Sequence, residues 1–401
     1  MSDVRRVNRA DVFRGTERVG VLERTNDGCT FSYADAFFAS HRETPGGIAR
    51  QFQWTTQRFE QRGDNLHAFF AGLLPEGLRL KAIVDGLKTS ESDLFSLLLA
   101  TGSDTVGDIA VVAEGEQPTD AATLNATPSA ETFRELWARS LATRRFGPTV
   151  GGVQNKLSPG TMSLPITGLS RRKAYLLKLT PEHLPRLVEN EFFFMRCAHA
   201  CGLKVAKCEL VHDREGESAL LVERFDRRWH RETKTLERLH QEDVCQLLNR
   251  FPQDKYRLGC AQVSEALEAC TAPVVARALF IERLAFSYVI GNGDLHARNV
   301  SVTQGNAGLA MSPGYDLLTT LPYGDRRMAL EFEGRDDNFK RRDFVAFGER
   351  HGVAAAWTEK RLSQLTAKLA PWLAKLGDIG LEASRTADLE RVMTKRLADL
   401  A

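Results

Sequence analysis

The sequence lacks long apolar stretches, a strong net charge and a dense set of cysteines, and each deficit excludes a class of protein. Its longest apolar runs, such as residues 97–100, fall far short of the roughly 18 residues that span a bilayer. A net charge of only +2 gives no support to a polybasic nucleic-acid binder. Seven cysteines without a tight framework indicate reduced thiols. Because no apolar signal segment follows Met1, we expect a cytoplasmic enzyme or interaction protein.

What the sequence does have is the composition of an ordinary folded protein with more than one domain. Hydrophobic residues make up 43% and charged residues 26% of the 401 residues. At about 150 residues per domain, this length suggests two or three domains. The clearest change of composition is the polar, small-residue-rich segment 114–130, within which we predict a linker at 117–130.

The part before this linker combines signals for strands and helices. Short strands are predicted at 18–22 and 29–33 with a turn at 26–28, and residues 66–100 are mostly helical in pattern. Residues 1–116 are therefore predicted to form an N-terminal α/β subdomain.

The part after the linker divides into a small sheet-containing lobe at about 131–225 and a mainly helical lobe at about 226–401. The elements predicted in the first lobe are strands at 175–179, 207–211 and 219–223 and a helix at 186–201. Beyond Arg224 the pattern becomes dominantly helical, with a buried helix marked by Phe280, Leu284 and Tyr288. We predict an α+β fold class with a bilobal, kinase-like layout, although layout alone is weak evidence for function.

Two cysteines in the predicted helix at 186–201 raise the question of a metal site. Cys197 and Cys201 lie four residues apart, on one helix face, with His199 between them. No second Cys/His pair follows at a zinc-like spacing, so we predict buried structural cysteines.

The strongest local signal for chemistry is the segment 291–300, GNGDLHARNV. Asp294 followed by Asn299 after a buried helix reproduces the spacing of a kinase catalytic loop. In phosphoryl transfer the carboxylate orients and deprotonates the attacking hydroxyl, and the amide oxygen holds Mg²⁺. The alternative is a polar turn in which both residues cap chain ends. His296 and Arg298 in the same window favour catalysis.

Further residues supply the other parts of a nucleotide site. Asp316, 22 residues after Asp294, is predicted to hold the metal against the phosphates, although alone it would fit a helix N-cap. Lys178, on an apolar strand, fits the cation that binds the phosphates; the alternative is a solvent-facing edge charge. The loop 149–156 contains Gly151 and Gly152, which let a backbone approach phosphate closely, but it is a weak signal by itself.

Taken together, these segments resemble the HipA family of Ser/Thr protein kinase toxins from bacterial type II toxin–antitoxin pairs. The resemblance covers nearly the whole chain, and its motifs occur in the right order. The segments that carry it are 69–76, 102–107, 149–156, 177–179, 188–191, 222–228, 241–246, 294–299 and 316.

The resemblance implies a role for each matching residue. Asp294 would be the catalytic base, with His296 and Arg298 beside it in the catalytic loop, and Asn299 and Asp316 would bind Mg²⁺. The implied ATP-binding residues are Lys178, Val150, Gly151, Gly152, Val153, Gln154, Asn155, Lys156, Glu223 and Phe225, with the last two framing the adenine. Thr149 replaces the family's autophosphorylated serine, and Asn155 replaces an acidic residue. These two departures from the family pattern concern the regulation of the enzyme more than its assignment as a kinase.

The family also implies partners and a substrate class. We expect a cytoplasmic, ATP- and Mg²⁺-dependent toxin that phosphorylates an aminoacyl-tRNA synthetase, glutamyl-tRNA synthetase being the typical target. A helix-turn-helix antitoxin (HipB-like) would neutralise it and would provide most of the contact with operator DNA. The alternatives are a small-molecule phosphotransferase of the antibiotic-kinase type and a catalytically silent corepressor.

The sequence alone leaves three questions about side-chain roles open. Arg227 and Arg228 form either a solvated pair or an anchor to an acidic partner. His296 either shapes the catalytic loop by hydrogen bonding or packs there. Glu191 either pairs with Lys178, as the helix glutamate does in protein kinases, or faces solvent.

Overall fold

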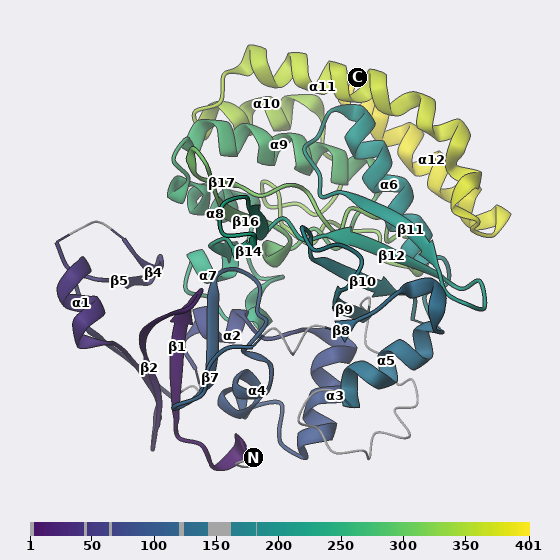
Figure 1. The fold of residues 1–401 in the computed structure, drawn as a ribbon. Helices are drawn as coiled ribbons and strands as arrows, with labels where there is room; N and C mark the ends of the chain where they lie inside the picture. Colours follow the sequence, from purple (N-terminus) through teal and green to yellow (C-terminus); the bar gives the residue numbers. More distant parts are fainter. Residues whose placement is uncertain (1–3, 44–45, 64–65, 120–123, 143–161, 182) are drawn as a thin grey trace. The chain divides into compact units, whose positions relative to one another are not determined.

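The computed structural model describes residues 4–43, 46–63, 66–119, 124–142, 162–181 and 183–401 (Figure 1). The chain forms two compact units. Unit 1 comprises residues 1–177, 212–217 and 226–252, and unit 2 comprises residues 178–211, 218–225 and 253–401. The mixed helix and sheet composition agrees with the predicted fold class.

Unit 1 contains a five-stranded antiparallel sheet with the strand order β6-β3-β2-β1-β7. Figure 1 labels three of these strands, β1, β2 and β7. Its strands are β1 (Arg9–Arg14), β2 (Glu17–Thr25), β3 (Gly28–Tyr33), β6 (Arg58–Arg62) and β7 (Ile109–Ala113). The predicted hairpin is confirmed: Thr25 pairs with Gly28, whose φ of 141° suits a residue without a side chain.

Short helices accompany this sheet. They are α1 (Asp35–His41), α2 (Ala68–Gly72), α3 (Gly77–Leu87), α4 (Leu94–Thr101) and α5 (Phe133–Ala142). The helical prediction for 66–100 is therefore confirmed. An aromatic core fills the space beside the sheet, where the rings of Phe31, Phe52 and Phe70 lie about 5 to 5.5 Å apart and are fully buried.

The remaining strands of unit 1 are short. They are β4 (Gly47–Ala49) paired with β5 (Phe52–Gln53), β8 (Leu124–Asn125) paired in parallel with β9 (Met162–Thr167), β13 (Arg227–His230) paired with β14 (Thr235–Arg238), and β15 (Gln241–Asp243) before α7 (Val244–Leu247). The expectation that the chain is dominantly helical beyond Arg224 is thus wrong for residues 227–243. Strand β13 lacks an apolar alternation because Arg227, rather than an aliphatic side chain, is the group that becomes buried.

Arg227 shows how this burial works. Its guanidinium donates to Asp104 at 2.9 Å and to Asp226 at 2.7 Å, and its side chain is 7% exposed. Arg238 donates to the carbonyl oxygen of Ser103 at 2.9 Å, on the same loop. Arg228 differs, because it pairs with Glu237 at an exposed position. The sequence left open whether this pair is solvated or anchored to an acidic partner. In the structure Arg227 is the anchor and Arg228 is the solvated residue.

A second buried charge cluster in unit 1 is centred on His240. Its Nδ1 lies 3.2 Å from Asp108 and its Nε2 lies 3.0 Å from Glu242. Arg14 donates to Asp108 at 2.8 Å, and the backbone N–H of Arg50 donates to Glu242 at 2.9 Å. Burial lowers the pKa of His240, but the hydrogen bonds and charges of the two carboxylates outweigh burial and raise it to about 9.

Unit 2 combines a small sheet with a group of helices (Figure 1). The strands β11 (Cys208–His212), β12 (Ser218–Glu223) and β10 (Tyr175–Leu179) lie in that order, and the boundary between the units falls within β10. The helices are α6 (Leu187–Cys201), α8 (Cys260–Ala266), α9 (Pro273–Ile290), α10 (Arg341–Arg350), α11 (Ala355–Leu369) and α12 (Ala383–Leu400). These elements confirm the predicted strands, the helix after 186 and the buried helix around Leu284.

In unit 2, α9 is the central helix of the helical part. It contacts α10, α11 and α12, and every residue from Phe280 to Ile290 is buried. A hairpin of β16 (Ser301–Gly305) and β17 (Gly308–Met311) follows the loop at the end of α9. The fold thereby places the predicted catalytic loop at the end of a buried helix and a few residues before a hairpin.

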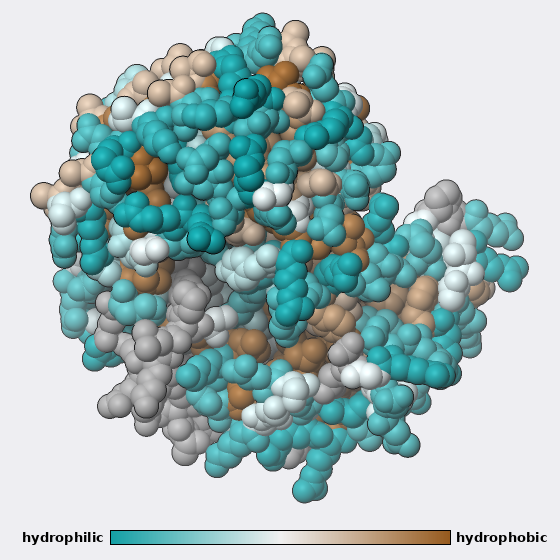
Figure 2. All heavy atoms as spheres, turned by 180° about the vertical axis from the view of Figure 1, so that it is seen from behind, coloured by the Kyte–Doolittle hydropathy of each residue, from teal (hydrophilic) through white to brown (hydrophobic). Residues whose placement is uncertain are grey.

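The face of the molecule drawn in Figure 2 is largely hydrophilic over the described residues. Their exposed large hydrophobic side chains are Val106, Leu169, Tyr256, Val274, Val275 and Trp357. Among the helices in the described ranges, none has the length and apolar character needed to cross a membrane.

The His240 cluster predicts a specific pH dependence of stability. The pKa of His240 is raised in the folded state. Its contribution to the stability of the fold is therefore complete below pH 6.5 and is lost as the pH rises through 9. From this shift we expect His240→Gln to lower the free energy of unfolding by about 3 kcal/mol at pH 6 and by little at pH 10. Urea denaturation of the full chain at both pH values measures this difference. An equal loss at the two pH values would contradict the prediction.

Candidate active site

Lys178, near the end of β10, lies buried between two carboxylates of unit 2. Its ammonium group donates to Oε1 of Glu191 in α6 at 2.6 Å and also to Asp316. The side chains of Lys178 and Glu191 are 7% and 1% exposed, whereas that of Asp316 is 32% exposed. Lys178 is therefore not a solvent-facing edge charge, and it joins a deeply buried carboxylate to one that solvent reaches.

The charges of this cluster perturb one another. Burial lowers the pKa of Lys178, but Asp316 and Glu191 outweigh burial and raise it above the usual value, so the amine stays protonated. Burial raises the pKa of Glu191 to about 7, against the opposing effect of Lys178. Two carboxylates thus share one ammonium group. When both are ionised, the cluster has an excess negative charge that favours a second cation beside Asp316.

The predicted catalytic loop begins where Gly291 ends α9 with a φ of 71°, a left-handed conformation that glycine adopts without strain. The side chain of Asn292 accepts from the Asp294 N–H at 2.9 Å, and Nδ2 of Asn299 donates to the Asp294 carbonyl oxygen at 2.8 Å. Asn299 is buried, and the side chain of Asp294 is 44% exposed. The loop is therefore fixed by its own amide side chains while it presents a carboxylate to solvent.

Asp316 lies in an irregular segment after β17 and has a φ of 55°, an uncommon value for a residue with a side chain. Such conformations persist when the surroundings hold them, and they cluster at functional sites. Asn292 donates to the Asp316 carbonyl oxygen at 3.4 Å. No helix starts after Asp316, since the next one, a 3-10 turn at Leu321–Tyr323, follows Thr320. The N-cap alternative for Asp316 is therefore wrong.

Tyr315 connects the Asp316 segment to the catalytic loop. Its hydroxyl donates to the Arg298 carbonyl oxygen at 2.8 Å, and it lies 3.1 Å from Oγ of Ser301. Its ring lies 5.6 Å from that of Phe225, with 31° between the planes. The structure thus brings Phe225, a predicted adenine neighbour, to the segment that carries Asp316. Tyr315 was missed because nothing in the sequence separates it from an ordinary core aromatic.

His296 is packed into the catalytic loop. It is 3% exposed, and its Nε2 lies 3.8 Å from Oδ1 of Asp294, beyond hydrogen-bond distance. Its ring meets the edge of the Tyr256 ring at 5.1 Å. Tyr256, also missed by sequence reasoning, donates its hydroxyl to Oδ1 of Asp294 at 2.7 Å.

The other predicted site residues fall into two groups. Glu223 is half-buried at the end of β12, where its N–H donates to the Lys207 carbonyl oxygen at 2.8 Å, and Arg298 is half-buried in the catalytic loop. Thr149, Val150, Gly151, Gly152, Val153, Gln154, Asn155 and Lys156 lie outside the described residues.

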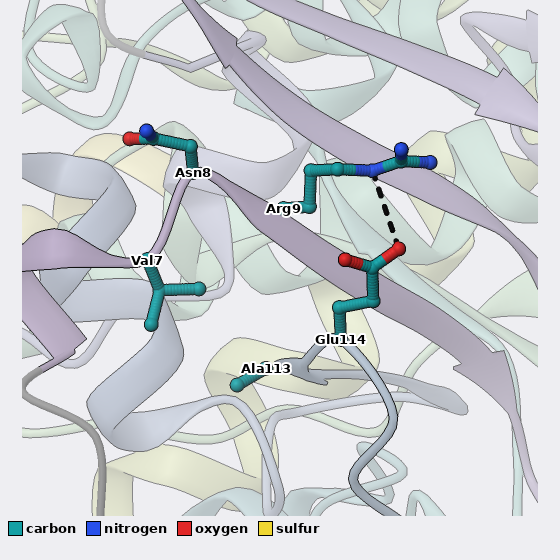
Figure 3. Close-up of a pocket in the computed structure, with 5 residues that line it drawn as sticks. All are labelled: Val7, Asn8, Arg9, Ala113 and Glu114. Atoms are coloured by element: carbon teal, nitrogen blue, oxygen red, sulfur yellow. Dashed lines mark ion pairs between the residues drawn. The ribbon is translucent and has the colours of Figure 1, made fainter.

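The described residues contain two other features that resemble binding sites, a surface pocket in unit 1 and the cysteine pair of α6. A surface pocket of about 370 Å³ in unit 1 is lined by Val7, Asn8, Arg9, Ala113 and Glu114 (Figure 3). Its two charged residues pair with each other at 3.4 Å, as the dashed line shows, so it offers a ligand little unused charge. Cys197 and Cys201 are fully buried in α6, as predicted.

Comparison with solved structures defines the class of fold. A chain of the Shewanella oneidensis complex of toxin HipA, antitoxin HipB and operator DNA superimposes with a TM-score of 0.74 at 22% identity, and the match covers 97% of this chain and 96% of that chain. The fold is therefore the mixed helix and sheet fold of the HipA type.

Comparison of sequences gives the family itself. Residues 149–373 match the HipA-like C-terminal domain, and residues 10–112 match the HipA N-terminal domain. The chain belongs to the HipA family.

Individual relatives are consistent with this membership. The chain is 31% identical to the Sinorhizobium fredii protein Y4dM, which is named as a candidate kinase, over 79% of this chain and 78% of that protein. It is 28% identical to the Serine/threonine-protein kinase toxin HipA of Shewanella oneidensis, over 71% of this chain and 70% of that protein.

Proposed function

We propose that this chain is an ATP- and Mg²⁺-dependent serine/threonine protein kinase that acts as the toxin of a toxin–antitoxin pair. The observation that carries the proposal is the buried ammonium of Lys178, shared between Glu191 and Asp316. A lysine–glutamate pair beside a loop aspartate is the arrangement that protein kinases use to hold ATP phosphates and metal. Membership of the HipA family and the kinase names of its relatives support the same reading.

In this proposal the described residues divide the chemistry among them. The Asp294 carboxylate accepts the proton of the acceptor hydroxyl as that oxygen bonds to the γ-phosphorus, and the bond from phosphorus to the bridging oxygen of ADP breaks. Lys178 neutralises charge on the ATP phosphates. Phe225 and Tyr315 offer a flat apolar surface against which the adenine ring can pack.

The donor set beside Lys178 fits Mg²⁺. This ion prefers carboxylate and amide oxygens and keeps several waters, so one or two protein ligands suffice. Asp316 supplies a half-exposed carboxylate. The amide nitrogen of Asn299 is engaged with the Asp294 carbonyl oxygen, which leaves its amide oxygen as the metal-binding atom. A bound Mg²⁺ would also balance the excess negative charge around Lys178.

The proposed substrate is an aminoacyl-tRNA synthetase of the glutamyl type, whose phosphorylation would arrest translation in the cytoplasm. The proposed partner is a helix-turn-helix antitoxin, through which the chain would reach operator DNA. The name of the solved Shewanella oneidensis complex, in which HipA occurs with HipB and operator DNA, supports this partner.

Replacement of the proposed base tests the activity. Asp294→Asn keeps the size of the side chain but removes the proton acceptor, so we expect phosphoryl transfer to fall at least a hundredfold, or about 3 kcal/mol in the barrier. Radiolabelled ATP, purified protein and a cell lysate measure the labelled bands, and mass spectrometry identifies them. Growth arrest on expression should disappear with the labelling. Undiminished labelling by the variant would exclude Asp294 as the base.

The proposed metal ligands should respond differently to Mg²⁺ concentration. Asp316→Ala removes a charged ligand and also a partner of Lys178, whereas Asn299→Ala removes one neutral oxygen. We expect raised Mg²⁺ to restore part of the activity of Asn299→Ala and less of that of Asp316→Ala. Titration of initial rates with Mg²⁺ measures this. Wild-type activity of both variants at low millimolar Mg²⁺ would place the metal elsewhere.

Thr149 is the proposed autophosphorylation site. A phosphate there adds about −1.5 to −2 charge, which would repel the ATP phosphates and favour an expelled, inactive loop. We expect phosphate on Thr149 after incubation with ATP and Mg²⁺, and none in Asp294→Asn, by peptide mass spectrometry. Ser158 is a competing acceptor hydroxyl nearby in the sequence. Phosphate confined to Ser158, or none in a protein that labels its substrate, would contradict the proposal.

A further inference from the structure

Tyr256 approaches the proposed catalytic base from the solvent side. Its phenol hydroxyl donates to Oδ1 of Asp294 at 2.7 Å, the normal length of a hydrogen bond from a hydroxyl to an oxygen. Tyr256 is 53% exposed, and it is the only tyrosine among the described residues with a large exposed surface. A hydroxyl in contact with Asp294 is also what a phosphoacceptor must supply.

The position of Tyr256 is fixed by the catalytic loop itself. The N–H of Ala297 donates to the Lys255 carbonyl oxygen at 3.2 Å, which ties the backbone beside Tyr256 to the loop. The ring of His296 packs edge-on against the tyrosine ring at 5.1 Å, and Nζ of Lys255 lies 5.2 Å from its centre. The contact with Asp294 is therefore part of an ordered local structure.

We propose that Tyr256 marks the phosphoacceptor site and that an incoming acceptor hydroxyl displaces its phenol from Asp294. The inference rests on the proposed kinase function and adds the place where the acceptor binds. A general base must lie within hydrogen-bond distance of the proton that it removes, so the acceptor competes with the phenol for Asp294. The half-exposed ring and the ammonium of Lys255 then border the acceptor, which suits a serine or threonine on an exposed protein segment.

Competition of this kind predicts whether a conservative substitution of Tyr256 raises or lowers the reaction rate. Tyr256→Phe keeps the ring and removes only the hydroxyl, so the phenol no longer competes with an acceptor for Oδ1 of Asp294. Water is the smallest acceptor, and it tests the site without knowledge of the protein substrate. We expect the rate of ATP hydrolysis in the presence of Mg²⁺ to rise about three- to tenfold, the range of one partly exposed hydrogen bond. The Kd of Mg²⁺–ATP, measured by titration calorimetry, should stay within about twofold, because the substitution removes a hydrogen bond to the base and keeps the ring.

Two variants serve as controls. Tyr288→Phe removes a phenol hydroxyl whose hydrogen bond, at 3.3 Å, is to Asp399 in the helical part, and it should leave the hydrolysis rate unchanged. The double variant Tyr256→Phe with Asp294→Asn should lose the gain, because the carboxylate that accepts the proton is no longer there. Thermal unfolding of each variant checks that the fold is kept.

The hydrolysis rate of Tyr256→Phe either supports or overturns the proposed acceptor site. A higher rate in Tyr256→Phe with unchanged ATP binding supports it. An equal or lower rate in a variant that binds ATP overturns it, because the phenol then either does not restrain the base or assists it. Failure of the wild-type chain to bind Mg²⁺–ATP would instead refute the proposed function on which the inference rests.

Discussion

The buried ammonium group of Lys178 is the constraint on which the arrangement of the site depends. A charge taken out of water is stable only when an opposite charge and hydrogen bonds replace the lost hydration. Lys178 obtains both from Glu191 on α6 and Asp316 on the segment after β17, so these two elements must lie beside the end of β10. Asn190 strengthens the same junction, because its side chain exchanges hydrogen bonds with the backbone of Thr319 at 2.8 and 3.1 Å.

The same segment is bound to the catalytic loop by neutral hydrogen bonds. Tyr315 reaches the Arg298 carbonyl oxygen, and Asn292 reaches the carbonyl oxygen of Asp316 while it also holds the Asp294 N–H. The two carboxylates proposed for metal and proton transfer are thus held on connected backbones, whereas both side chains remain accessible to solvent. This combination of a fixed backbone and an accessible carboxylate is what a phosphoryl-transfer site requires.

Features set by local sequence could be predicted, and features set by distant contacts could not. The strand at 175–179 and the helix after 186 follow from short-range patterns of apolar residues, and the spacing of Asp294 and Asn299 identifies the loop within one segment. The contact of Tyr256 with Asp294 joins residues 38 positions apart, and a single tyrosine carries no signal of it. The strands β13 and β14 were missed for a related reason: burial of Arg227 depends on Asp104, 123 residues away, and arginine normally indicates exposure.

We propose above that Lys178, Asn299 and Asp316 hold a nucleotide and its metal. A crystal structure of the chain with a non-hydrolysable ATP analogue and Mg²⁺ tests it most directly. We expect Nζ of Lys178 to donate to a phosphate oxygen and oxygens of Asp316 and Asn299 to coordinate the metal. A nucleotide bound away from Lys178, or a metal without a ligand from either Asp316 or Asn299, would refute this assignment of the site.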